Sequence, residues 1–219
     1  MNAKAGIYST TLLQRRRLSK RAIEIKLEKP RLFKFDSGQR ICLIHKTVKR
    51  DYSIVSVSAD PDICLCIRLV RGGVFSTELN TAPIGSRFGF TGPSGYFTFK
   101  PSVRPAVFVA TGTGVAPFCS MIRAGATGVT LLHGTKSPAE LYYKSIFQSA
   151  AILYVPCLSG PGESSEAYFH GRVTDYLQTH LAPGLYDFYL CGRQEMIRDV
   201  THLVDERFSS SHIYSEIFY

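Results

Sequence analysis

Residues 106–124 constrain the fold more than any other part of the chain. The run 106–110 is small and apolar, which predicts a buried strand, and Thr-Gly-Thr-Gly at 111–114 then predicts a sharp turn. Pro117 begins an expected helix over 117–124, at a position where its missing N–H is not needed. A strand, a glycine turn and a helix N-terminus together favour a bound diphosphate, because N–H groups and the helix dipole attract negative charge. An ordinary strand-to-helix turn shows the same pattern, so this stretch alone leaves both interpretations open.

The chain divides into two halves of different pattern. Residues 1–101 contain short alternating segments, such as 23–27 and 64–69, between Gly and Pro turn signals, which predicts an antiparallel β-barrel. Residues 102–219 alternate apolar strands with helices, which predicts a Rossmann-like α/β domain with a parallel sheet. The strands expected in this second domain are 106–110, 128–133, 151–156 and 186–191, and the helices are 117–124, 138–148, 173–180 and 194–207.

Composition excludes several classes of protein. No apolar run approaches the ~20 residues needed to span a bilayer. The N-terminus lacks the apolar core of a signal peptide, so a cytoplasmic protein is expected. None of the six cysteines forms a Cys-x-x-Cys pair or a cluster with zinc or iron–sulfur spacing. We therefore expect buried, reduced thiols, no metal site and no iron–sulfur cluster.

The net charge of +9 has its densest run between residues 15 and 21. A solvated strand and loop explains such a run, as does docking of an acidic protein partner or attraction of an anionic cofactor. No zinc finger, RNA-binding aromatic motif or basic helix accompanies the charge, so nucleic acid is not an expected partner. The residues of the run are Arg15, Arg16, Arg17, Lys20 and Arg21.

Two further motifs lie in the first half. Arg50-Asp51-Tyr52-Ser53 alternates a cation, an aromatic ring and a hydroxyl at a strand end. Arginine can bind a phosphate bidentately and tyrosine can stack on a flat ring, although a plain strand end has the same residues. The segment 71–79 is a glycine turn leading into a short helix, with Ser76 as the expected N-cap. A second anion-binding helix terminus and a simple capped helix both fit it.

In this order, the motifs resemble those of the ferredoxin–NADP reductase superfamily of flavoenzymes, along nearly the whole chain. Ser37 departs from the pattern, because that family has proline there. The segments that carry the resemblance are Phe35–Gln39, Arg50–Ser53, Gly72–Ser76, Gly92–Phe97, Gly112–Pro117, His133-Gly134 with Glu140–Tyr143, and Cys191–Met196.

The resemblance implies an FAD site in the barrel. Arg50 would bind the flavin phosphate, Tyr52 would stack on the isoalloxazine, and Ser53 would reach its N5 edge. The residues implied for the pyrophosphate are Gly73, Val74 and Ser76.

The resemblance also implies a nicotinamide-nucleotide site in the second domain. Cys191 would lie beside the nicotinamide and align its C4 for hydride transfer, although a buried thiol at a strand end needs no such role. Gly192 and Met196 belong to the same motif. The residues implied for the diphosphate are Thr111, Gly112, Thr113, Gly114 and Pro117.

Several members of the family end in Glu-x-aromatic, where the aromatic covers the flavin. Here Glu216 and Phe218 fit that spacing, and Tyr219 fits it after a shift of one residue. A final edge strand with exposed aromatics is the alternative.

The choice between NADH and NADPH depends on cations near the adenosine ribose. Relatives specific for NADP often carry Ser-Arg after the third strand of this domain. Here Ser159 is followed by Gly160, and Glu163 is acidic, which favours NADH. Lys136 and Arg172 lie where they could approach the same region.

The resemblance implies a stand-alone reductase that transfers hydride from NAD(P)H to FAD and then single electrons to an external acceptor. A ferredoxin, or the iron–sulfur component of an oxygenase, fits the basic charge. One alternative is a free-flavin or ferric reductase of the same fold. Another is a nucleotide-binding electron-transfer subunit without turnover, against which the intact Arg50, Ser53, Cys191 and Glu216 argue.

Overall fold

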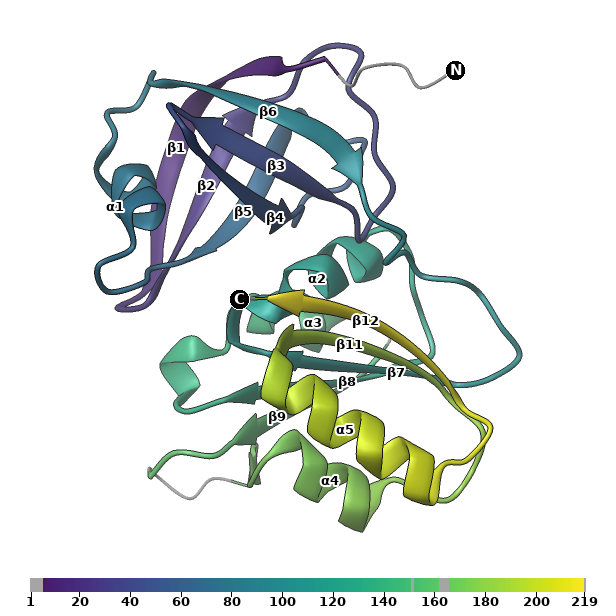
Figure 1. Ribbon diagram of the computed structural model, residues 1–219. Helices are drawn as coiled ribbons and strands as arrows, with labels where there is room; N and C mark the ends of the chain where they lie inside the picture. The colour runs from purple at the N-terminus through teal and green to yellow at the C-terminus, as the bar shows by residue number, and fades with distance from the viewer. Residues whose placement is uncertain (1–5, 151, 162–165, 219) are drawn as a thin grey trace. The chain divides into compact units, whose positions relative to one another are not determined.

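A computed structural model describes residues 6–150, 152–161 and 166–218, and divides the chain into two compact units (Figure 1). Unit 1 comprises the residues up to 98 together with 116–124. Unit 2 comprises residues 99–115 together with those from 125 onward. The helix that follows the glycine turn is thus grouped with unit 1, whereas the turn itself belongs to unit 2.

Unit 1 is an antiparallel sheet that closes on itself. Its elements are β1 (Tyr8–Ser19), β2 (Ala22–Glu28), β3 (Arg40–His45), β4 (Val48–Ser53), β5 (Asp62–Arg68), β6 (Arg87–Ser94), α1 (Val74–Thr81) and α2 (Ala116–Arg123). The strand order is β4-β3-β6-β1-β2-β5, and each neighbouring pair is antiparallel. Ile54, directly after β4, forms an isolated bridge with Leu65 of β5, which links the two outer strands. The antiparallel barrel predicted from sequence is confirmed.

Alternation along the strands builds the interior of unit 1. Ile23, Ile25 and Leu27 of β2 are at most 1% exposed, and the charged residues between them point to the other side of the strand. Burying an aliphatic side chain of this size contributes about 1.5–3 kcal/mol. The turn residues Lys20 and Arg21 connect β1 to β2 as a two-residue hairpin, with Ser19 opposite Ala22.

Unit 2 is a parallel sheet with helices. Its elements are β7 (Ala106–Thr111), η1 (Gly112–Val115), β8 (Val129–Thr135), η2 (Pro138–Glu140), α3 (Lys144–Ser149), β9 (Leu153–Leu158), β10 (Phe169–His170), α4 (Val173–His180), β11 (Asp187–Arg193), α5 (Gln194–Arg207) and β12 (His212–Phe218). The strand order is β10-β9-β8-β7-β11-β12, with every pair parallel. The predicted α/β domain with a parallel sheet is confirmed.

The two faces of this sheet have separate packing. Helices α4 and α5 lie on one face (Figure 1), where Val109 and Leu190 pack with Val200 of α5 in one hydrophobic core. The alternate residues Phe108 and Tyr189 point to the opposite face, where their ring centroids are 5.2 Å apart. In the described part of the chain, no helix has the length and apolar character required to cross a membrane.

Two local expectations were wrong. The single helix expected over 138–148 is interrupted, because Tyr143 has a φ of 61° and a left-handed residue cannot continue a right-handed helix. Ser76 is not the N-cap of α1, because the helix already begins after Gly73. The Ser76 hydroxyl instead accepts a hydrogen bond of 3.2 Å from the N–H of Val70.

Candidate functional site

Strand β4 and helix α1 lie against each other in unit 1. The rings of Tyr52 on β4 and Phe75 on α1 stack with centroids 6.2 Å apart and planes 17° apart. This contact brings the Arg-Asp-Tyr-Ser strand beside the glycine turn that begins the helix. Burial raises the pKa of the half-buried Tyr52, against a smaller lowering effect of Arg50, so the hydroxyl keeps its proton.

The other residues of the β4 motif differ in exposure. Arg50 is exposed, and its guanidinium donates a hydrogen bond of 2.8 Å to the carbonyl of Lys49. A guanidinium has five N–H donors, so this one bond leaves it able to bind a phosphate. Asp51 pairs with Arg40 at 3.3 Å, whereas Ser53 is buried at the end of the strand.

The turn before α1 is crowded at Gly73. A Cβ on Gly73 would lie 2.9 Å from the Ser76 hydroxyl and 3.0 Å from the Val70 Cβ, so a side chain there would force its neighbours to shift. Val74, the first helical residue, is 74% exposed, and the first turn is uncharged. A helix N-terminus of this kind, with Arg50 as a further cation and Tyr52 as a flat ring, fits a ligand that has a diphosphate and an aromatic ring system.

In unit 2, the glycine turn is packed directly against the end of β11. A Cβ on Gly114 would lie 2.7 Å from the Gly192 Cα and would overlap the Cys191 carbonyl. A Cβ on Gly192 would in turn overlap the Thr111 hydroxyl. That hydroxyl accepts a hydrogen bond of 3.0 Å from the N–H of Arg193. The loop therefore begins at the carboxyl ends of β7 and β11, where ligands collect in open α/β sheets.

No sequence motif marks Arg193 as part of this loop. Its backbone N–H fixes the Thr111 side chain, and the signal for this bond lies only in the register of β7 and β11, which the sequence does not show.

Cys191 and Glu216 lie side by side on two neighbouring parallel strands. They are register partners on β11 and β12, and both are buried, with Cys191 at 0% and Glu216 at 7% exposure. Burial, and then the charge of Glu216, raise the pKa of the Cys191 thiol well above its ordinary value. The thiol is therefore neutral. Phe218 is half-buried opposite Arg193, and Tyr219 lies outside the described residues.

The residues expected near the adenosine ribose lie at the ends of neighbouring strands. The N–H of Ser159 donates to the carbonyl of Thr135 at 3.0 Å, which places Ser159 next to Lys136. The N–H of Gly171 donates to the Leu158 carbonyl at 2.9 Å, so Arg172 follows the adjacent strand. The side chains of Lys136 and Arg172 are both exposed.

The remaining predicted residues have different surroundings. Thr113 is half-buried in η1, and Pro117 is buried in the first turn of α2. Met196 packs in the hydrophobic core of unit 2 at 8% exposure, so its side chain stabilises α5 against the sheet.

Both units match known protein families. A family of oxidoreductase FAD-binding domains matches residues 9–99, and a family of oxidoreductase NAD-binding domains matches residues 108–202. The structure resembles that of a ferredoxin–NADP reductase from Neisseria gonorrhoeae, with a TM-score of 0.87, 21% identity, and coverage of 99% of this chain and 100% of that one. That likeness shows the shared fold.

Curated relatives give a closer comparison in sequence. Ferredoxin–NADP reductase B of Sorangium cellulosum is 31% identical over 230 residues, which cover 91% of this chain and 92% of that protein. Reductase component 2 of terephthalate 1,2-dioxygenase from Comamonas is 30% identical over 212 residues, which cover 90% of this chain but 62% of that protein. The toluate 1,2-dioxygenase electron transfer component of Pseudomonas putida is matched over 49% of its length. The chain thus spans about half to two thirds of these two oxygenase components.

The FAD-binding family covers the barrel, the NAD-binding family covers the parallel sheet, and the likeness to the Sorangium reductase extends over nearly its full length. The chain therefore belongs to the ferredoxin–NADP reductase family, and it is an FAD-dependent oxidoreductase with an NAD(P)-binding domain.

Proposed function

We propose that the protein is a reductase that oxidises NADH or NADPH and delivers single electrons to an acceptor protein, either a ferredoxin or the iron–sulfur component of an oxygenase. One observation carries this proposal: the chain combines the Arg50–Tyr52 strand beside α1 with the glycine loop beside Cys191, as expected for a protein 31% identical to a ferredoxin–NADP reductase. The likeness to oxygenase reductase components supports the second kind of acceptor.

In unit 1, the residues around β4 and α1 would hold FAD. Arg50 and the first turn of α1, with Gly73, Val74 and Ser76, would bind the pyrophosphate. Tyr52 would lie against the ring system, and Ser53 would hydrogen-bond its edge. When bound, FAD supplies the conversion of one hydride into two single electrons, which protein side chains cannot perform.

The loop from Thr111 to Gly114, in unit 2, would bind the nicotinamide cofactor's diphosphate through backbone N–H groups, and Pro117 would help to begin the helix that follows it. Cys191 would pack beside the nicotinamide. Its raised pKa supports a role for the neutral thiol in orienting the ring, and not in proton transfer. Glu216 and Phe218, on the neighbouring strand β12, would also line this site.

We further propose NADH as the preferred cofactor. Strand β9 is followed by Ser159 and Gly160. The position after Ser159 therefore has no arginine that could bind a 2′-phosphate. Glu163, which lies outside the described residues, adds a negative charge to this segment. Lys136 and Arg172 are the cations that oppose this preference.

The acceptor is expected to be acidic. The chain has a net charge of +9, and opposite charges accelerate and orient the encounter of electron-transfer partners. Raising the salt concentration should therefore slow reduction of the protein acceptor more than reduction of a small neutral one.

Anaerobic stopped-flow mixing of the FAD-loaded protein with NADH and with NADPH tests the proposal. We expect loss of flavin absorbance with both, and faster with NADH. Cytochrome c reduction should then rise when an acidic ferredoxin is added. Negligible bleaching by either nucleotide contradicts hydride transfer, whereas bleaching without a ferredoxin effect, but with rapid reduction of free FMN, favours a free-flavin reductase.

A further inference from the structure

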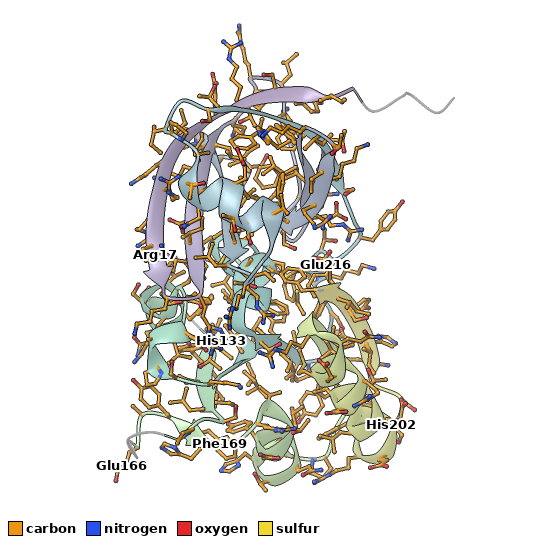
Figure 2. All side chains as sticks on the ribbon, turned by 60° about the vertical axis from the view of Figure 1, so that its left-hand side comes forward. Arg17, His133, Glu166, Phe169, His202 and Glu216 are labelled. Carbon is orange, nitrogen blue, oxygen red and sulfur yellow. The ribbon has the colours of Figure 1, made fainter. Side chains whose placement is uncertain are left out.

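A histidine in unit 2 is fully enclosed and uses both ring nitrogens. His133 on β8 is 0% exposed and lies in the interior of the unit (Figure 2). Its Nε2 is 3.2 Å from the carbonyl oxygen of Gly112, the first glycine of the Thr111–Gly114 loop. Its Nδ1 is 3.3 Å from the hydroxyl of Tyr154 on β9. The ring of Phe147 on α3 meets the imidazole edge-on, with centroids 6.5 Å apart.

The chemistry of these partners fixes the tautomer of His133. Burial lowers the pKa of His133 to about 4, against the raising effect of the Gly112 carbonyl, so the ring is neutral at pH 7. A neutral imidazole carries one N–H, and a carbonyl can only accept. Nε2 must therefore carry the hydrogen that it donates to Gly112. Nδ1 is then an acceptor, and the Tyr154 hydroxyl donates to it.

The direction of the Gly112 carbonyl is linked to the direction of the N–H that follows it. The peptide bond between Gly112 and Thr113 is trans, and in a trans peptide the carbonyl and the following N–H point in opposite directions. With the Gly112 carbonyl directed at the buried histidine, the Thr113 N–H is directed away from it. Gly112 has a φ of +54°, and apart from its two chain neighbours no described atom lies within 4 Å of the place a Cβ would take, so packing there does not hold the residue.

We propose that His133 is a positioning residue for the nicotinamide-nucleotide loop: its Nε2–H, with Nδ1 accepting from the Tyr154 hydroxyl, orients the Gly112 carbonyl inward and so presents the Thr113 N–H to a cofactor phosphate. This inference rests on the proposed function, which places the cofactor diphosphate at this loop. The bond from His133 acts on binding of the nucleotide and not on the hydride-transfer step.

Two substitutions separate the two ring nitrogens. His133→Gln retains an N–H near the position of Nε2, whereas His133→Asn retains a polar group only near Nδ1. Tyr154→Phe removes the donor to Nδ1, which supports the same tautomer. Each FAD-loaded variant is titrated with NAD⁺ and NADP⁺ by calorimetry, and its KM and kcat for NADH are measured with ferricyanide as the acceptor.

We expect H133N to raise the nucleotide Kd and the KM by about tenfold, the effect of one lost hydrogen bond, with kcat within about twofold of the wild type. H133Q should stay within about threefold of the wild type, and Y154F should fall between the two. Equal losses in H133N and H133Q, or wild-type affinity in both, would overturn the inference.

The tautomer of His133 can also be measured directly in the wild-type protein. Nitrogen-15 NMR of the histidine rings at pH 7 should show His133 as the Nε2–H tautomer, and in Y154F a share of Nδ1–H should appear. An Nδ1–H tautomer in the wild type would overturn the inference while leaving the proposed function intact. Wild-type protein that binds neither nucleotide would contradict the proposed function, and the inference with it.

Discussion

Cys191 of β11 and Glu216 of β12 are direct register partners, so they lie side by side on the last two strands of the parallel sheet. Gly114 of the glycine loop packs onto the carbonyl of the same cysteine. Three motifs that are far apart in sequence therefore meet at Cys191. A side chain at this position has little freedom to move, which suits a group that orients a ligand.

Replacing Cys191 should affect the rate of flavin reduction. We expect Cys191→Ala to slow the bleaching of FAD by NADH roughly 10- to 100-fold, since small errors in alignment of the reacting atoms have effects of this size. Cys157→Ala is the matched control, because Cys157 is also 0% exposed but lies on β9. Stopped-flow absorbance measures both rates. If FAD is reduced at equal rates in the two variants, Cys191 has no specific role in aligning the nicotinamide.

Two glycines of the loop should respond differently to alanine. In Gly114→Ala the new Cβ overlaps the backbone of β11, so we expect the free energy of unfolding to fall by about 2–3 kcal/mol. In Gly112→Ala the space is open and only the positive φ is strained, which costs about 1–2 kcal/mol. Urea titration of both variants measures the difference. A larger loss in Gly112→Ala would contradict the packing of the loop on Cys191.

Both sheets could be predicted from sequence because their signals are local. Strict alternation, as in Ile23, Ile25 and Leu27, reports a strand with one buried face, and it holds whatever strand lies beside it. The apolar run from Ala106 to Ala110 followed by glycines likewise predicted β7 and the loop. The break at Tyr143 carried no such signal, because its left-handed backbone is set by the surrounding structure and not by glycine.

The candidate sites were predictable only as a set of motifs. The hydrogen bonds from His133 to Gly112 and Tyr154 depend on the pairing of β7, β8 and β9, since a shift of one residue would turn His133 to the other face of the sheet. No sequence signal marks Tyr154, because a tyrosine within an apolar strand is compatible with any core.

Arg50 should determine how tightly FAD is held. Arg50→Ala removes a cation with a bidentate geometry for phosphate, and we expect the Kd for FAD to rise about 10- to 100-fold. Lys49→Ala is the control, because Lys49 is the exposed neighbour on the same strand. Flavin fluorescence after dilution measures the FAD released from each protein. Similar release from both variants would assign the phosphate to another cation.

The burial of His133 should make stability depend on pH in a defined window. Its pKa is about 4 in the folded protein and about 6.5 when unfolded, so between these values the unfolded chain binds more protons. Stability is then lost as the pH falls from 6.5 to 4, by about 3 kcal/mol for this group. The groups that face the ring are the Gly112 carbonyl, the Tyr154 hydroxyl and the Phe147 ring, none of which is charged there.

The measurement compares urea unfolding of the wild type and of H133Q at pH 7, 5.5 and 4. Glutamine does not titrate, so the wild type should lose about 3 kcal/mol more than H133Q over this range, while carboxylates elsewhere affect both proteins equally. An equal loss in the two proteins would mean that the pKa of His133 is close to its unfolded value. The imidazole would then be partly charged near pH 6.5, and the single tautomer that orients the Gly112 carbonyl would not persist below neutral pH.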